Sequence, residues 1–194
     1  MDNFQELYLA AAGRQDELRD GAFLNLPLNL CGFPCAPLTA RRFAVLMHSR
    51  SPFLCGGVPM PEHVAQFLWA LHPAFGYTNT KERDAFIQSC GAIEYAAAVD
   101  ELRAFIEDCF MDSPPTSGNR SESYNSWLAS LVDTLAREYG WSEGEILELP
   151  MARFFQYIRL IVARNCPNVP QFNKLTDGVK NTFLNQLNAK PEAT

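Results

Sequence analysis

Apolar residues recur at helical spacing through most of this 194-residue chain, and prolines and glycines divide the pattern into short segments. The longest such segment is residues 92–110. Its apolar stripe consists of Tyr95, Val99, Leu102, Phe105, Ile106 and Cys109. Shorter runs predict helices over residues 3–12, 38–49 and 171–188. The pattern as a whole predicts an all-α fold, a multi-helix bundle of seven or eight helices.

Local end signals support these boundaries. Three pairs match the capping-box spacing, at Asn79–Glu82, Asn119–Glu122 and Ser142–Glu145. Gly140 is placed to end the helix before it, because glycine accepts the left-handed backbone of a helix C-terminus.

Residues 21–38 interrupt the helical pattern. Pro27, Gly32, Pro34 and Pro37 favour an irregular segment here. Apolar residues alternate with others near its start, which is compatible with a short strand or hairpin, although Pro27 confines such a strand to an edge.

A linker is expected at residues 112–121, whose sequence is DSPPTSGNRS. It divides an N-terminal helical region, residues 1–111, from a C-terminal one, residues 122–190. The charge changes at the same place: residues 1–112 hold fourteen acidic and eight basic side chains, and residues 113–194 hold eight of each. Two domains and a single bundle both remain compatible with this pattern.

The charge distribution argues against nucleic acid as a partner. The net charge is −6, and no stretch collects the basic side chains that phosphate neutralisation requires. Arg41 and Arg42 form only an isolated pair.

The chain is expected to stay in the cytoplasm of the cell that makes it. Its first residues, MDNFQELYLAAAG, include acids and lack the basic start and long apolar run of a signal peptide. Its apolar stretches fall short of the roughly 20 residues that span a bilayer, so no membrane partner is expected. Its six cysteines are then expected to be reduced thiols.

The candidate metal ligands are Cys31, Cys35, His48 and Cys55, which supply four groups of the kind that zinc prefers. Their spacing is loose, and cysteine often packs as a small apolar residue. We therefore expect structural thiols and no cofactor, with a zinc-stabilised helical module as an alternative. His63 and His72 lie nine residues apart on one helix, too distant to share a metal directly.

Motifs for catalysis are absent from the sequence. There is no G-x-S-x-G, H-E-x-x-H or Cys–His signature, and no phosphate-binding glycine loop. We therefore expect a protein that is not an enzyme.

Aromatic residues, by contrast, are abundant for a small helical protein, with fourteen Phe, six Tyr and three Trp. Aromatic side chains beside arginines, such as Tyr157 beside Arg153 and Arg159, are typical of interaction hot spots. Core packing is the competing interpretation for any one of them.

Two stretches resemble proteins of tailed bacteriophages and prophages. Residues 37–57 resemble a pattern of small phage morphogenetic proteins, in which a helix is followed by S-P-F, a glycine pair and a second helix. Residues 139–156, YGWSEGEILELPMARFFQ, are similar to the aromatic–Gly–Trp–Ser, acidic and Pro arrangement of tail assembly chaperones.

This resemblance implies a small helical protein that binds a tape-measure or tube protein before tail assembly. The candidate partner-binding residues are Trp141, Arg153, Phe154 and Tyr157, chosen as aromatic or arginine anchors. A structural virion component of the neck, tail or baseplate is the alternative within the same setting.

Overall fold

The computed structural model describes most of the chain. The described residues are 2–24, 26–76, 78–113, 126–168, 171 and 173–188. The Asn119–Glu122 capping-box pattern and residues 114–121 of the expected linker lie outside them.

Helices dominate the described residues, as the sequence predicts. The ten α-helices are α1 (Asp2–Gly21), α2 (Ala40–His48), α3 (Pro52–Cys55), α4 (Pro61–Leu71), α5 (Thr80–Ser89), α6 (Tyr95–Cys109), α7 (Trp127–Tyr139), α8 (Glu143–Leu147), α9 (Met151–Asn165) and α10 (Lys174–Asn188). Two of them, α3 and α8, are single short turns of four and five residues, so eight longer helices carry the fold. A one-turn 3-10 helix, Cys90–Ala92, precedes α6. The all-α prediction is confirmed.

A two-stranded hairpin lies in the irregular segment. Strand β1 (Leu28–Leu30) pairs antiparallel with β2 (Phe33–Cys35), with Leu28 opposite Cys35. Cys31 and Gly32 form its turn with positive φ angles of 52° and 83°, a combination that suits the twist of a tight hairpin.

Helix α1 is longer than the sequence pattern predicts. The apolar spacing ends near residue 12, but the helix continues to Gly21. Its inward face beyond that point carries polar side chains, including Gln15, which is buried, and Arg19. A pattern that counts only apolar residues cannot detect a face of this kind.

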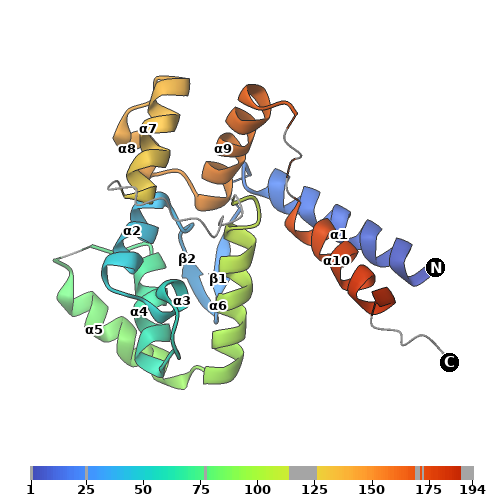
Figure 1. The fold of residues 1–194 in the computed structure, drawn as a ribbon. Helices are drawn as coiled ribbons and strands as arrows, with labels where there is room; N and C mark the ends of the chain where they lie inside the picture. Colours follow the sequence, from blue (N-terminus) through green and yellow to red (C-terminus); the bar gives the residue numbers. More distant parts are fainter. Residues whose placement is uncertain are drawn as a thin grey trace.

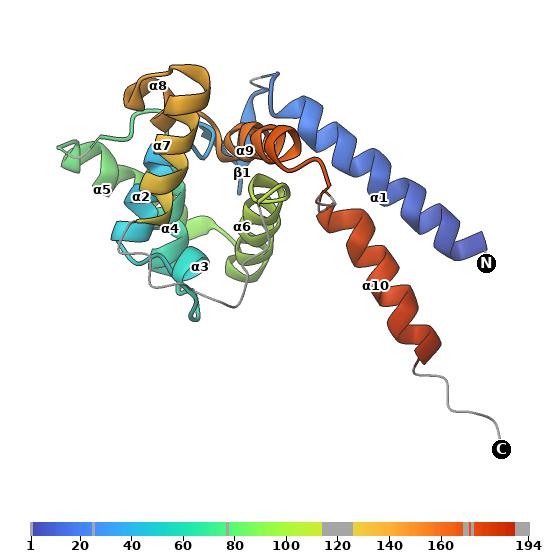
Figure 2. The same cartoon turned by 45° about the horizontal axis from the view of Figure 1, so that its top comes forward.

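Helices α1 and α10 form an arm that extends from the rest of the protein. Figures 1 and 2 show the two helices side by side, with the start of α1 and the end of α10 at the far end of the arm. At that end the Phe4 and Phe183 rings lie 4.6 Å apart between centroids. The helices therefore run antiparallel, and we call this unit the α1–α10 arm.

Helices α2 to α9 and the hairpin make up the body, which has one hydrophobic core. Its fully buried side chains include Phe67, Leu71 and Leu102 from the N-terminal region and Leu135 and Phe154 from the C-terminal region. The two regions that the sequence separates thus bury their apolar surface against each other.

Backbone hydrogen bonds also join these two regions. The Met151 amide donates to the Leu38 carbonyl at 2.8 Å, and the Ala40 amide donates to the Leu149 carbonyl at 3.0 Å. These bonds fix the start of α9 beside the start of α2.

A buried carboxylate connects the arm to the body. Asp112, three residues after the end of α6, has a side chain only 3% exposed and accepts from Arg19 Nη2 at 2.7 Å and Nε at 3.0 Å. Arg159 Nη1 of α9 lies 3.4 Å from the same carboxylate. Asn173 Oδ1 accepts from both guanidiniums, at 3.1 Å from Arg19 and 2.7 Å from Arg159. One charged network thus holds α1, α6, α9 and the segment before α10.

The pKa values of the two guanidiniums reflect this network. Hydrogen bonding to Asp112 raises the pKa of Arg19, whereas burial and then the nearby Arg19 charge lower the pKa of Arg159. Two cations sharing one carboxylate repel each other, so the charge on Asp112 is needed to keep them together.

Candidate protein-binding surface

Three of the four residues proposed as partner-binding anchors come together beside α9. Trp141 lies between α7 and α8, and Arg153 and Tyr157 lie one turn apart on α9. Phe154 is separated from them, because its side chain is fully buried in the core. It therefore offers no surface to a partner in this fold.

The rings of this group pack in alternating orientations. Tyr139 stacks on Trp141 with centroids 4.7 Å apart, and Trp141 meets Tyr157 edge to face at 4.9 Å. Phe23, from the turn after α1, meets Tyr157 edge to face at 6.0 Å. Offset and edge-to-face arrangements are those that aromatic quadrupoles favour.

Two arginines border these rings. The Arg153 guanidinium lies 5.1 Å from the Phe23 ring centroid, and its Nη2 donates to the Ala22 carbonyl at 2.8 Å. Arg164 lies 5.5 Å from the Tyr139 centroid and donates to its hydroxyl at 3.2 Å. Both distances fall within the range of cation–π attraction. We call the six residues Phe23, Tyr139, Trp141, Arg153, Tyr157 and Arg164 the aromatic–arginine cluster.

Local sequence signals place the cluster. Gly140 ends α7 in the left-handed conformation, with φ 68°, and turns the chain so that Trp141 stacks back on Tyr139. Ser142 and Glu145 then form the expected capping box at the start of α8. The predictions of a helix end at Gly140 and of a capping box at Ser142–Glu145 are confirmed, whereas Asn79 makes no capping hydrogen bond at the start of α5.

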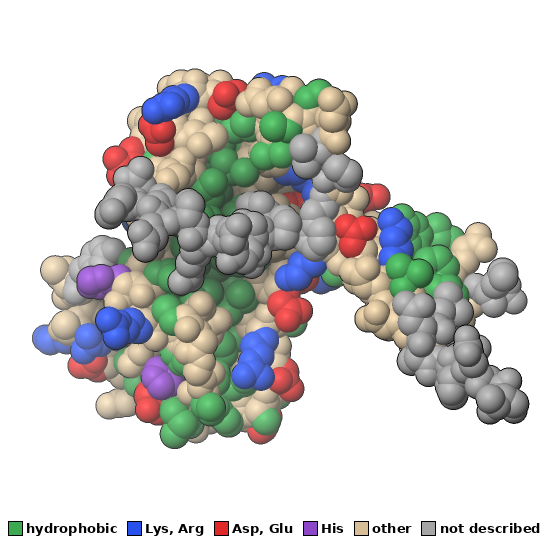
Figure 3. Space-filling view, in the orientation of Figure 1, with side chains coloured by type: hydrophobic (Ala, Val, Ile, Leu, Met, Phe, Trp, Pro, Cys, Tyr) green, Lys and Arg blue, Asp and Glu red, His purple; other side chains and the backbone are tan. Residues whose placement is uncertain are grey.

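The cluster is only partly covered. Phe23 is 44% exposed, and Tyr139, Trp141 and Tyr157 are half-buried. Leu160, one turn after Tyr157 on α9, is 53% exposed. Figure 3 shows apolar side chains gathered around the upper helices of this view. Half-buried Tyr and Trp rings beside arginine have the composition of an interaction hot spot.

Sequence reasoning missed Phe23, because it lies outside any periodic segment. Leu24 and Leu26, which follow it in the sequence, also have exposed apolar side chains. Several large apolar residues stand together in a segment that is expected to be irregular. A loop rarely needs them, so they are the sequence signal that could have indicated a binding surface here.

The four candidate zinc ligands do not form a metal site. Cys31 and Cys35 lie on the hairpin, whereas His48 ends α2 and Cys55 ends α3. The Cys55 thiol instead contacts the Met47 carbonyl and sulfur, at 4.0 and 3.9 Å. Within the described ranges, no three His, Cys, Asp or Glu side chains gather as a metal site requires.

The hairpin thiols are also disposed to stay protonated. Burial and then the neighbouring Glu101 carboxylate raise the pKa of Cys31 to about 12, and burial raises the pKa of Cys35. Metal binding and nucleophilic attack both use the thiolate, which these surroundings disfavour.

His63 and His72 have local structural partners at the two ends of α4. His63 Nδ1 accepts from the amide of Met60, the N-cap residue of α4, at 2.9 Å. His72 Nδ1 accepts from the Ala74 amide at 3.1 Å, and its ring stacks on Trp69. Both histidines therefore act in the packing and capping of α4.

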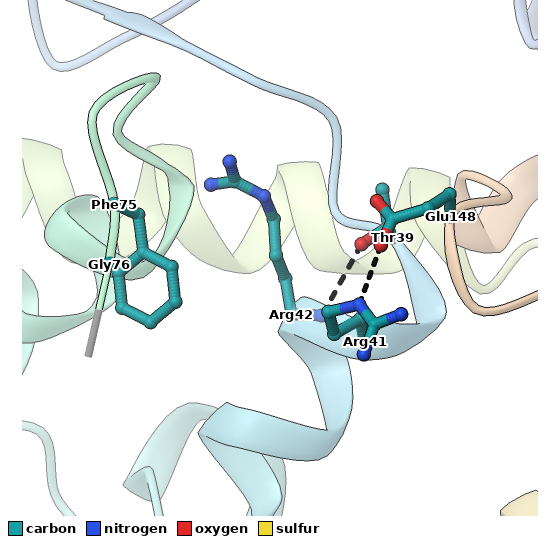
Figure 4. Close-up of a pocket in the computed structure, with 6 residues that line it drawn as sticks. All are labelled: Thr39, Arg41, Arg42, Phe75, Gly76 and Glu148. Atoms are coloured by element: carbon teal, nitrogen blue, oxygen red, sulfur yellow. Dashed lines mark hydrogen bonds and ion pairs between the residues drawn. The ribbon is translucent and has the colours of Figure 1, made fainter. Parts of the chain in front are cut away.

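A small polar pocket of about 230 Å³ lies at the start of α2, lined by Thr39, Arg41, Arg42, Phe75, Gly76 and Glu148. Figure 4 shows the Arg41–Glu148 pair on one side and Arg42 extending toward Phe75 on the other. Arg41 Nε lies 2.5 Å from Glu148 Oε1, and Arg42 Nη1 donates to the Ala70 carbonyl at 2.5 Å. Burial lowers the pKa of Arg42. Both guanidiniums are committed to the protein's own acceptors, which argues against an anion site here.

The chain matches no protein-family model, no curated protein sequence and no solved structure. Among the described residues, no helix has the length and apolar character that crossing a membrane requires.

Proposed function

We propose that this chain is a non-enzymatic protein-binding factor whose partner contacts the aromatic–arginine cluster. The observation that carries the proposal is the gathering of Trp141, Arg153 and Tyr157 with Phe23 on one partly exposed surface. Tyr, Trp and Arg are the residue types that dominate binding energy at protein interfaces.

The packing within the cluster favours binding. Each ring is held by a neighbouring ring, and Arg153 is held by the Ala22 carbonyl. Side chains that are already ordered lose less conformational entropy when a partner arrives. The cluster also combines apolar rings with two cations, so the partner surface that suits it is apolar with acidic residues at its edge.

The more specific proposal is a role in phage tail morphogenesis. It rests on the resemblance of residues 37–57 and 139–156 to phage proteins, and the second stretch supplies Tyr139, Trp141 and Arg153 of the cluster. In this role the chain binds a tape-measure or tube protein before assembly and leaves before the particle is complete. A structural component of the virion is the alternative.

The test is co-expression of the tagged chain with candidate tape-measure and tube proteins, followed by mass analysis of what co-purifies. We expect a stoichiometric complex with one of them, and finished particles without this chain. Recovery of the chain from washed particles would favour the structural alternative. Purification without either protein would remove the support for the phage role.

A further inference from the structure

A groove runs between the two helices of the α1–α10 arm near its free end. It has a volume of about 310 Å³, and its lining includes Asn3, Phe4, Leu7, Val179, Thr182 and Phe183. The Phe4 and Phe183 rings lie against each other between the two helices, and Thr182 of α10 also lines the groove. The groove therefore has the form that receives apolar side chains from another helix.

The same face carries a protruding apolar side chain. Leu7 lines the groove and is nevertheless 54% exposed. A surface with a depression and an exposed leucine side by side is self-complementary. Across a two-fold axis, each copy places its leucine at the groove of the other.

The charges permit this arrangement. The chain has a net charge of −6, so most of its surface repels a second copy. The groove lining contains no Asp, Glu, Lys or Arg side chain. A two-fold axis brings a surface against its own equivalent, so a lining without charge avoids like-charge contacts.

The size of the arm is sufficient for a weak dimer. The 15 residues of α10 are about 22 Å long, and two helices side by side are roughly 20 Å wide, so each face measures about 450 Å² in projection. Two complete faces give about 900 Å², an upper limit that falls among the weak, transient interfaces below about 1,200 Å². Figures 1 and 2 show the arm extending clear of the body, and Figure 3 shows apolar side chains on it.

We propose that the grooved face of the α1–α10 arm joins two copies of this chain into a symmetric dimer through a four-helix contact. Two helices alone leave one side of their apolar contact open, and two arms close it, as in helix bundles. The aromatic–arginine cluster is a separate surface. The dimer therefore does not depend on the proposed partner.

The test is the mass of the full chain in solution, measured by light scattering or sedimentation between about 1 and 200 µM, a range that covers the micromolar dissociation constants of weak complexes. We expect a mass that rises toward twice 21.8 kDa with concentration. Leu7→Glu places two carboxylates at the two-fold contact, and Thr182→Glu does so from α10. Each is expected to weaken the dimer at least about 30-fold.

Leu9→Glu is the matched control, because Leu9 is 61% exposed on the same helix and does not line the groove. Circular dichroism of all three variants checks that the helices are retained. The control is expected to dimerise like the wild type. A wild-type chain that stays monomeric at about 200 µM overturns the proposal. A dimer that L7E and T182E leave unchanged also overturns it. Loss of a bound partner protein in L7E, with a monomeric wild type, would assign the groove to that partner and also overturn it.

Discussion

Replacing Asp112 with Asn tests the joint between the arm and the body. The substitution keeps the shape of the side chain and removes the charge that Arg19 and Arg159 share. Removing one partner of a buried ion pair costs about 3–5 kcal/mol. Arg19 is 22% exposed and partly solvated, so we expect D112N to lower the free energy of unfolding by about 2–4 kcal/mol. For a chain of this length that corresponds to a fall in Tm of roughly 4–16 °C.

The assay is urea unfolding followed by circular dichroism. The slope of the unfolding free energy against urea concentration should be unchanged, which checks that the variant exposes as much surface on unfolding as the wild type. Asp108→Asn is the matched control, because Asp108 pairs with Arg14 of the same helix α1 at 2.8 Å but both side chains are exposed. Its expected cost is about 0.2–1 kcal/mol. If D112N costs no more than D108N, the buried network does not hold the arm and the reasoning is wrong.

Three further predictions concern single residues. Gly140→Ala should lower the free energy of unfolding by about 1–2 kcal/mol, because alanine must adopt the φ of 68°. A Cβ there meets no neighbouring atom, so the cost comes from the backbone conformation alone. Urea unfolding measures the loss, and an unchanged midpoint would contradict it. Ser142→Ala should cost about 1 kcal/mol by removing the α8 cap, and a loss no larger than that of an exposed serine elsewhere would show the cap to be unimportant. Burial raises the pKa of Cys109 to about 12, so the folded state keeps this proton above pH 9, where the unfolded state loses it; the stabilisation is complete below about pH 9 and is lost as pH rises toward 12. The free energy of unfolding should therefore decrease less between pH 8 and pH 10 in Cys109→Ala than in the wild type. Equal decreases in the two proteins would exclude a contribution from the Cys109 thiol.

Features set by neighbouring residues were predictable from the sequence. The Ser142–Glu145 capping box and the left-handed Gly140 both depend on contacts within a few positions. Asn79 is a partial exception: α5 begins after it as expected, but its side chain contacts Glu82 and caps no backbone amide. The position of a helix start thus follows from local pattern more reliably than the hydrogen bonds that form there.

Features that depend on distant partners were not predictable. The second half of α1 is stabilised through Arg19, whose partner Asp112 lies 93 residues away. Asp112 itself was assigned to a linker, because its neighbours Pro114 and Pro115 are typical of one. Its burial depends on two arginines that only the fold brings near it.

The candidate surface shows the same division. Residue type alone selected Trp141, Arg153 and Tyr157, and it also selected Phe154. Phe154 shares the inward stripe of α9 with Ile158 and Ile161, so helical spacing is the signal that separates it from the surface residues.

The most direct test of the proposed binding surface is the affinity of a protein that co-purifies with this chain for three forms of it: the wild type and two single variants. Leu160→Glu places a charge beside the cluster, whereas Leu184→Glu makes the same change at a side chain of nearly equal exposure on the arm, 54% against 53%. Calorimetric titration should give a Kd at least about 30-fold weaker for L160E, as expected at a hot spot, and a Kd near the wild-type value for L184E. Equal affinities for wild type and L160E would contradict the assignment of partner binding to the aromatic–arginine cluster.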